Sequence, residues 1–133
     1  MSDTTIETPY GMDLLWASHK DYACKILVFH KAKNRTSMYF HKNTDKTWFC
    51  NAGKFKLRYV DVKDGSMYEA ELEEGKVFNV PPLMPVQLEA LADNSSITEA
   101  SNGYDEYDIY HVIPADKWSE NELWSWKIKQ SRK

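Results

Sequence analysis

The sequence predicts an all-β sandwich or barrel. Turn-forming stretches recur about every ten residues, and the segments between them alternate between polar and apolar side chains. The alternation is clearest in KFKLRYVDV, where Phe55, Leu57 and Tyr59 lie on one face of a strand and basic side chains lie on the other. One face of such a strand packs on a core and the other meets solvent. With 133 residues, the chain has the length of one domain with a substantial core.

Ten strands are expected between turn-forming segments such as KNRTS, NAG, KDGS, EEGK, PPLMP and ADNSS. In chain order they are Leu14–Ser18, Ala23–His30, Ser37–His41, Thr47–Asn51, Lys54–Val62, Ser66–Leu72, Lys76–Val80, Val86–Ala92, Ser96–Ser101 and Tyr107–Ile113.

The strand over 54–62 changes phase near its end, because Val60 and Val62 are apolar on what had been the polar side. A β-bulge near Tyr59–Val60 would restore consistent faces. The alternative is a strand end that is covered on both sides. The turn KDG that follows should close a hairpin onto SMYEAELE.

The C-terminal segment DKWSENELWSWKIKQ permits two interpretations. Ser119 and Glu122 have the spacing of a capping box, which would begin a helix. As a strand, the segment would place Trp124, Trp126 and Ile128 on one face. Those side chains would either pack against another subunit or close the end of the barrel.

Composition excludes several classes of function. The net charge of −3 gives no electrostatic surface for nucleic acid or an anionic membrane. No apolar run approaches the ~20 residues that cross a bilayer, and the N-terminus lacks the pattern of a signal peptide. Cys24 and Cys50 have no CxxC spacing and are expected to be buried free thiols, which favours a cytoplasmic protein.

The order of turns and strands resembles the cupin superfamily, and most closely its small single-domain members related to the type II mannose-6-phosphate isomerases. The resemblance covers roughly Pro9 to Val112 and is carried by PYGMDLLWA, KILVFHKAKNRTSMYFHK, TWFCNAGKFKLRY and LEEGKVFNVPPLMPVQLEA. It implies a double-stranded β-helix, that is, a jelly-roll barrel. We therefore expect one cupin domain over 1–133, with a core at about 9–113 and a short C-terminal extension at 114–133.

The resemblance extends to the first metal-binding motif of that family, which runs Ser, three residues, His-x-His, two residues, Glu-x-Trp, four residues, Gly. Ser37, His41, Trp48 and Gly53 match this spacing. The position of the second histidine is Asn43 here, and a lysine replaces the glutamate.

The second motif begins with a glycine, five residues and a proline, which Gly75 and Pro81 reproduce, but its histidine position is Val86. The four positions that bind the metal in that family are therefore occupied here by His41, Asn43, Lys46 and Val86. A valine has no lone pair, a lysine ammonium repels a cation, and an Asn carbonyl is a weak ligand for zinc or iron. The sequence thus predicts a barrel without a metal or other cofactor.

A barrel without a metal can keep a ligand pocket at its mouth. In this interpretation Lys46 and Arg58 engage a phosphate or carboxylate, Trp48 stacks on a sugar ring, and His41 transfers a proton. Each has a plainer alternative: a solvated lysine in the turn NTDK, an exposed arginine, a core tryptophan and a hydrogen-bonded histidine. The candidate residues are His41 as the catalytic group, with Tyr39, Asn43, Lys46, Trp48, Arg58 and Gln87 as ligand-binding groups.

Two functional hypotheses follow. The first is a non-catalytic module that binds a small carbohydrate, sugar phosphate or acidic metabolite. The second is a metal-independent sugar or nucleotide-sugar isomerase or epimerase in which His41 is the general base. Metal-dependent mannose-6-phosphate isomerase activity ranks last because of the ligand count. A homodimer is expected, because small cupins commonly pair and the Trp-rich tail needs cover; nucleic acid and membrane are not expected as partners.

Overall fold

The computed structural model describes residues 5–115 and 128–130. Twelve strands lie within these residues: β1 (Thr5–Thr8), β2 (Gly11–Ser18), β3 (Ala23–Phe29), β4 (Met38–Phe40), β5 (Lys46–Ala52), β6 (Lys54–Asp61), β7 (Ser66–Glu73), β8 (Val77–Val80), β9 (Val86–Ala90), β10 (Ser95–Ser101), β11 (Tyr110–Ile113) and β12 (Ile128–Gln130). All ten expected strands are present, with ends shifted by a few residues. The four-residue edge strand β1 was not anticipated, since a segment this short gives little pattern. β12 begins at Ile128, within the C-terminal segment for which a strand was one of the two alternatives.

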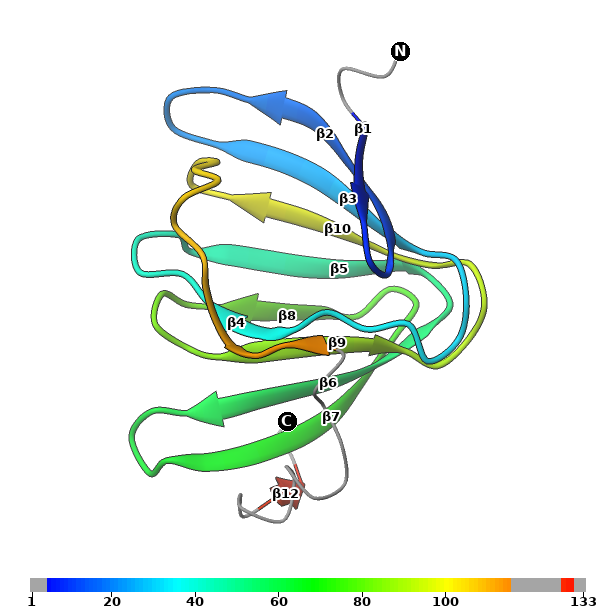
Figure 1. Cartoon of the computed structure of the whole chain (residues 1–133), viewed down its shortest axis with the longest axis vertical. Coiled ribbons are helices and arrows are strands. Elements are labelled where there is room, and N and C mark those ends of the chain that lie inside the picture. Colours follow the sequence, from blue (N-terminus) through cyan, green and yellow to red (C-terminus); the bar gives the residue numbers. More distant parts are fainter. Residues whose placement is uncertain (1–4, 116–127, 131–133) are drawn as a thin grey trace.

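The strands form two sheets that lie face to face (Figure 1). Sheet A has the order β1-β2-β3-β10-β5-β8, and sheet B has the order β11-β4-β9-β6-β7-β12. The pairings are antiparallel except for β12, which runs parallel to β7. The chain crosses repeatedly from one sheet to the other, so residues distant in sequence become neighbours. Among the described residues, no helix is long and apolar enough to span a membrane.

The main core fills the space between the sheets. Trp48 and Ile97 from sheet A pack there with Phe55 and Leu88 from sheet B, and all four side chains are fully buried. Each comes from an alternating strand, and burial of the apolar half of each strand supplies the main stabilisation of a two-sheet fold.

A second, smaller core lies on the opposite side of sheet B and contains Met38, Val60, Met67 and Ile113. It explains the change of phase in β6. The pairing of β6 with β7 continues without a shift from Lys54 to Asp61, so the expected bulge near Tyr59–Val60 is wrong. The alternative, a strand end covered on both sides, holds for Val60, which is buried in this second core. It is wrong for Val62, which follows the end of β6 and is 64% exposed.

The sequence alternatives for the Trp-rich tail concern residues that are mostly outside those described. Trp124 and Trp126, like the capping box at Ser119 and Glu122, lie in the undescribed segment 116–127. Cys24 and Cys50 are free thiols as expected; Cys50 is buried, whereas Cys24 is partly exposed.

Gly53 joins β5 to β6 in a backbone conformation with φ of +76°. A Cβ atom added there would lie 2.0 Å from Ser95 Oγ and 2.9 Å from Ser95 Cα. Gly65, in the next hairpin, has a similar φ of +69° but no atom within 4 Å of an added Cβ. A comparison of substitutions at the two glycines therefore distinguishes the cost of backbone strain from the cost of a steric clash with Ser95.

We expect Gly53→Ala to lower the free energy of unfolding by about 2–4 kcal/mol, since strain and overpacking add. The matched variant Gly65→Ala should lose only about 1–2 kcal/mol, from strain alone. Denaturant unfolding of both variants measures the difference. Equal losses would show that contact with Ser95 is not what requires a glycine at position 53.

Candidate functional site

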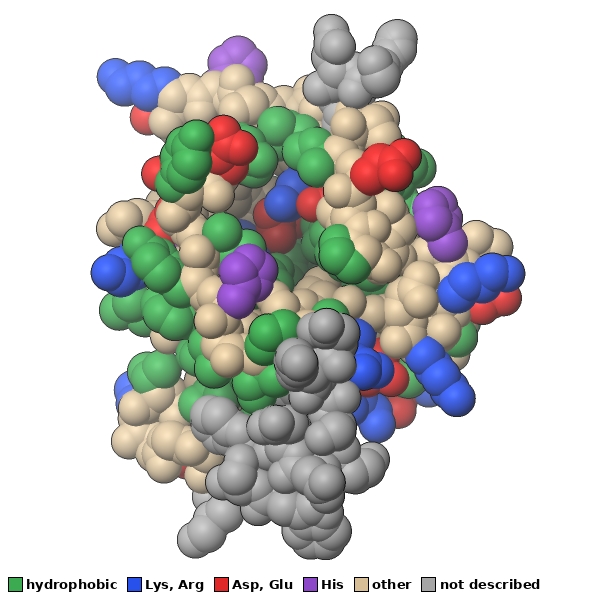
Figure 2. All heavy atoms as spheres, viewed as in Figure 1, with side chains coloured by type: hydrophobic (Ala, Val, Ile, Leu, Met, Phe, Trp, Pro, Cys, Tyr) green, Lys and Arg blue, Asp and Glu red, His purple; other side chains and the backbone are tan. Residues whose placement is uncertain are grey.

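The interior is not filled at one end of the two-sheet structure. A cavity of about 810 Å³ opens there, and its walls include Tyr10, Asp13, Tyr39 and His111. A smaller adjoining cavity of about 130 Å³ shares Lys25, His41 and Ile109 with it. Figure 2 shows the hollow in this face of the molecule, with acidic and basic side chains inside it.

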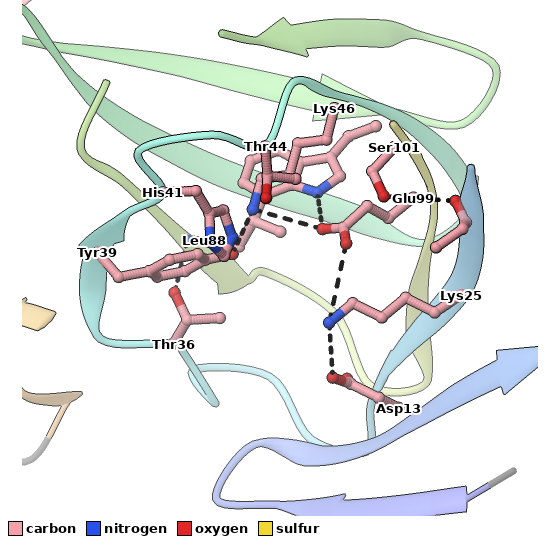
Figure 3. Close-up of polar contacts among 12 residues, drawn as sticks. Asp13, Lys25, Thr36, Tyr39, His41, Thr44, Lys46, Leu88, Glu99 and Ser101 are labelled. Carbon is pink, nitrogen blue, oxygen red and sulfur yellow. Dashed lines mark hydrogen bonds and ion pairs between the residues drawn. The ribbon is translucent and has the colours of Figure 1, made fainter. Parts of the chain in front are cut away.

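Four charged side chains of alternating sign form a continuous series of ion pairs, which begins at the wall of this cavity and ends in the interior behind it (Figure 3). Lys25 Nζ lies 3.4 Å from Asp13 Oδ2 and 3.8 Å from Glu99 Oε2, and Lys46 Nζ lies 3.5 Å from Glu99 Oε1. They occupy inward positions on β2, β3, β10 and β5, which are consecutive strands of sheet A. We call this set the charge array. Its two acids and two bases balance each other.

Lys46 is the most buried member of the charge array, with 2% of the residue exposed. Its ammonium donates to the Tyr39 hydroxyl at 3.0 Å, and it lies 4.5 Å and 4.9 Å from the ring centroids of Tyr39 and Trp48. The alternative of a solvated lysine in a turn is therefore wrong. Lys46 is the first residue of β5, so strand alternation turns its side chain inward.

Glu99 is held in its charged form. Burial alone would raise the pKa of Glu99, but Lys46 and Lys25, with a 2.9 Å hydrogen bond from Trp48 Nε1, lower that pKa from 4.5 to about 2. Burial lowers the pKa of Lys46, and the Glu99 carboxylate opposes that effect. We therefore treat the two as a buried ammonium–carboxylate pair.

The other end of the charge array is tied to β2. Tyr10 donates its hydroxyl hydrogen to Asp13 Oδ1 at 2.5 Å. Burial raises the pKa of Asp13, although Lys25 and Tyr10 oppose it. Burial, together with the Asp13 carboxylate, also raises the pKa of Tyr10, so this hydroxyl stays protonated.

His41 lies at the end of β4 and lines both cavities. Burial lowers the pKa of His41, and the charge of Lys46 lowers it further, so the imidazole is neutral at neutral pH. Its Nδ1 contacts the backbone carbonyl of Asp108, which can only accept a hydrogen. Nδ1 therefore carries the proton, and Nε2 keeps a lone pair.

The loop after His41 is fixed by the carboxylate of Asp108. Its oxygens accept hydrogen bonds from the amides of Lys42 and Asn43 at 2.9 and 3.0 Å and from the Thr44 hydroxyl at 2.9 Å. Burial would raise the pKa of Asp108, but these donors lower it overall. One residue thus orients the histidine through its carbonyl and holds the loop through its side chain.

The sequence candidates fall into three groups. Tyr39 and His41 line the large cavity. Lys46 and Trp48 contact Tyr39 or Glu99 from behind and do not line either cavity. Asn43 is exposed on the loop between β4 and β5.

Arg58 and Gln87 lie on the opposite side of sheet B from the cavity. The Arg58 guanidinium donates to Gln87 Oε1 at 2.7 Å and pairs with Glu69 and Glu89, each at 3.0 Å. Arg58 is 6% exposed, so the expectation of an exposed arginine is wrong: three acceptors on adjacent strands make its burial possible.

Sequence reasoning missed Asp13, Lys25 and Glu99 as site residues. The available signal was parity: each stands at an inward position of a strand whose neighbouring inward residues are apolar or small, as in CKILVF and SSITEAS. Charged residues at such positions are rarely solvated, and must find partners inside.

The residues at the implied metal positions do not fit a metal. Val86 is fully buried in the main core, Lys46 places an ammonium beside His41, and Asn43 is exposed on its loop. Within residues 5–115 and 128–130, no group of three or more His, Cys, Asp or Glu side chains could hold an ion. The donor set, rather than the fold, is what disagrees with a metal centre.

No protein-family model matches this sequence, and no curated protein matches it. Its fold, however, matches solved structures. Oxalate decarboxylase from Bacillus subtilis superposes with a TM-score of 0.74 at 16% identity, over 84% of this chain and 30% of that chain. CapF, a capsular polysaccharide assembling protein from Staphylococcus aureus, gives 0.71 at 16% identity, over 82% and 32%.

KdgF from Halomonas sp. gives a TM-score of 0.62 at 16% identity, over 71% of this chain and 80% of that chain. The chain spans about a third of the length of oxalate decarboxylase and CapF, and most of the length of KdgF. The predicted cupin-type, all-β fold is confirmed. At these identities the likeness concerns the fold alone.

Glu99→Gln should lower the free energy of unfolding by about 3–5 kcal/mol, because it leaves Lys46 as an uncompensated buried charge. The double variant Glu99→Gln/Lys46→Met should lose much less than the sum of the single variants, which a double-mutant cycle measures. The exposed pair Lys54–Glu71 (side chains 41% and 53% exposed) provides the control, and Glu71→Gln should cost less than about 1 kcal/mol.

The same pair sets a pH dependence. Because the folded-state pKa of Glu99 is lowered from 4.5 to about 2, its stabilisation is present above pH 4.5 and is lost as the pH falls toward 2. Glu99→Gln should flatten this part of the stability profile. Additive single-variant losses, or an unchanged acid profile, would contradict a coupled buried pair.

Proposed function

We propose that this cupin-fold chain binds a small hydroxyl-rich ligand, a carbohydrate or an acidic metabolite, in the cavity beside the charge array, and does so without a divalent metal. A volume of about 810 Å³ falls within the range of small-molecule sites. The walls combine aromatic rings and apolar side chains with a few polar groups, which is the usual composition of such sites. The finer kinship with mannose-6-phosphate isomerases remains part of this proposal.

The observation that carries the proposal is the state of Tyr39 and His41. The Tyr39 oxygen accepts from Lys46, so its own hydrogen is available to a ligand. Burial, with the Glu99 carboxylate, raises the pKa of Tyr39 and keeps the hydroxyl protonated. Beside it, His41 Nε2 is a hydrogen-bond acceptor. A donor next to an acceptor suits a ligand with neighbouring hydroxyl and carbonyl groups.

The charge array offers no unpaired cation that would attract a phosphate strongly. Lys25 is shared by Asp13 and Glu99, and the side chain of Lys46 is 0% exposed. Neither ammonium is therefore an unpaired cation at the cavity wall. The array orients polar groups at the wall, and ring stacking on Tyr10 or Tyr39 would supply much of the contact area.

The same pair of residues supports a second candidate function, metal-independent isomerisation or epimerisation of a sugar. The rings of Tyr39 and His41 lie 5.5 Å apart between centroids. Neutral His41 would accept a proton from a carbon next to a carbonyl, and the Tyr39 hydroxyl would donate a hydrogen bond to the carbonyl oxygen. The protonated His41 would then return the proton to the neighbouring carbon, which completes an isomerisation; an epimerisation would need a second proton donor on the opposite face of the carbon.

A panel of sugars, sugar acids and sugar phosphates, screened by thermal shift and confirmed by calorimetry, tests the proposal. We expect saturable binding, with a stabilisation of about 2.7 kcal/mol at a hundred times the dissociation constant. Tyr39→Phe should weaken binding by about 5- to 30-fold through one lost hydrogen bond. The matched variant Tyr110→Phe, on a side chain outside both cavities, should leave it unchanged.

His41→Ala separates the two functions. If the protein is a binding module, the variant binds within a few-fold of wild type and neither protein turns a ligand over. If it is an isomerase, solvent-proton exchange into the bound sugar occurs in wild type and is lost in the variant. Binding that ignores both Tyr39→Phe and His41→Ala would place the ligand elsewhere.

Protein purified without chelator should contain far less than one equivalent of transition metal, because the donor set at His41, Asn43, Lys46 and Val86 does not fit one. Elemental analysis measures the content, and EDTA should not change the melting temperature. A stoichiometric metal that disappears in His41→Ala would overturn the metal-free site.

A further inference from the structure

We propose that Ser37 and His111 form a nucleophile–base pair in the wall of the large cavity, and that this pair cleaves small carboxylic esters. Ser37 Oγ lies 2.6 Å from His111 Nδ1, and both residues line the cavity of about 810 Å³. A serine hydroxyl becomes an effective nucleophile when a base within hydrogen-bonding reach takes its proton. This reaction is separate from carbohydrate binding and from the proton transfer considered for His41.

Alternation along one segment brings the serine to the cavity. Arg35, Ser37, Tyr39 and His41 are alternate residues of the segment that forms β4 and its flanks, and all four line the large cavity. Ser37 is partly exposed, whereas the next residue, Met38, is fully buried in the second core. A molecule in the cavity can therefore reach the Ser37 hydroxyl.

A β-bulge in β11 brings the histidine to the serine. β11 pairs with β4 at the edge of sheet B (Figure 1). Beyond His111 the register shifts: Ile113 lies opposite Met38, so Val112 is an extra residue. A regular antiparallel ladder would instead place Ile113 opposite Ser37. The bulge sends Ile113 to the second core and leaves the imidazole of His111 beside the serine hydroxyl, as bulges near active sites often re-aim a side chain.

The contact is not needed to hold the edge strand. Backbone pairing already joins β11 to β4 on both sides of the bulge, and His111 is exposed, so this hydrogen bond contributes little to folding. Within residues 5–115 and 128–130, Ser37 Oγ has no other hydrogen-bond partner. The hydroxyl therefore donates to Nδ1, and the neutral imidazole carries its own proton on Nε2.

A second serine provides the contrast. Ser101 lines the smaller adjoining cavity, and its hydroxyl donates to the backbone carbonyl of Gly103 at 2.9 Å. A carbonyl oxygen accepts a hydrogen bond but does not take up the proton near neutral pH, so Ser101 is not activated. The two cavities thus offer one serine with a base and one without.

The proposed reaction is acyl transfer to Ser37 followed by hydrolysis. Ser37 Oγ forms a bond to the carbonyl carbon of the ester while its proton passes to His111 Nδ1. The bond from that carbon to the alcohol oxygen then breaks, and His111 gives the proton to the departing alcohol. A water molecule attacks the acyl-serine, with His111 taking the proton from water and returning it to Ser37 Oγ, which releases the carboxylic acid.

The negative charge of the tetrahedral intermediate requires a donor, and Arg35 is suitably placed. It stands two residues before Ser37 at the same parity and lines the same cavity. Its Nε donates to the carbonyl of Ala115 at 3.3 Å, which positions the guanidinium. A guanidinium presents five N–H donors, so it can keep its present partners and still direct positive charge toward an oxyanion.

Reaction of the full chain with diisopropyl fluorophosphate tests the pair. Ser37 Oγ forms a bond to phosphorus, the phosphorus–fluorine bond breaks, and the proton passes to His111 as fluoride leaves. Mass spectrometry should find one phosphoryl group per chain, on Ser37, and none in Ser37→Ala. His111→Gln should slow labelling by about 10²- to 10⁴-fold, the usual contribution of a general base. The matched variant Ser101→Ala should be labelled at the wild-type rate.

Turnover of p-nitrophenyl acetate gives a second readout. Wild type should release a burst of p-nitrophenolate equal to one per chain, and Ser37→Ala should show no burst; circular dichroism confirms that each variant is folded. Labelling at another residue, an unchanged rate in His111→Gln, or a wild-type rate no faster than that of N-acetylserine amide would overturn the proposal. Neither probe is a sugar, so a failure here leaves carbohydrate binding untouched, and a failure of the sugar panel leaves this pair untouched.

Discussion

The buried pair formed by Lys46 and Glu99 is the constraint on which the site depends. Neither charge could be buried alone, because an unpaired ion inside a protein costs many kcal/mol. Together they join β5 to β10 in sheet A, and the hydrogen bond from Lys46 to Tyr39 carries the link across to β4 in sheet B. The pair therefore supports the wall of the cavity and fixes the hydroxyl of Tyr39, a residue of that wall.

The burial of a lysine at position 46 accounts for the rest of the charge array. A buried lysine needs an acid, which Glu99 supplies from the neighbouring strand; Lys25 then balances the second oxygen of Glu99, and Asp13 balances Lys25. The two positive and two negative charges compensate one another, so the charge array is neutral overall. This places a fixed internal cation, rather than an exchangeable ion, behind Tyr39 and His41.

The sequence was sufficient to predict the positions of most strands and two of the residues at the cavity wall. Period-two alternation is a local property, so it located β2 to β11 and the inward parity of Tyr39 and His41. It could not locate the partners of Lys46, since Glu99 lies 53 positions further along and meets it only because β10 pairs with β5. The prediction that Arg58 is exposed was wrong for the same reason. Its acceptors Glu69 and Glu89 come from two other strands, which pair with β6 on either side.

The distribution of charge separates three environments in one small protein. Exposed pairs such as Lys54 with Glu71 lie on the outer face of sheet B, where water can screen them. On the same face, the buried Arg58 is compensated by Glu69 and Glu89. The charge array beside the cavity is neutral only as a whole. In each environment a charge must be either solvated or paired, and the local dielectric decides which. Ion pairs that contribute little at the surface become obligatory inside, because every member must be compensated by another. Substitutions at neutral residues such as Tyr39 and His41 would therefore change which ligand the cavity binds. Single substitutions within the charge array would instead alter the stability of the fold.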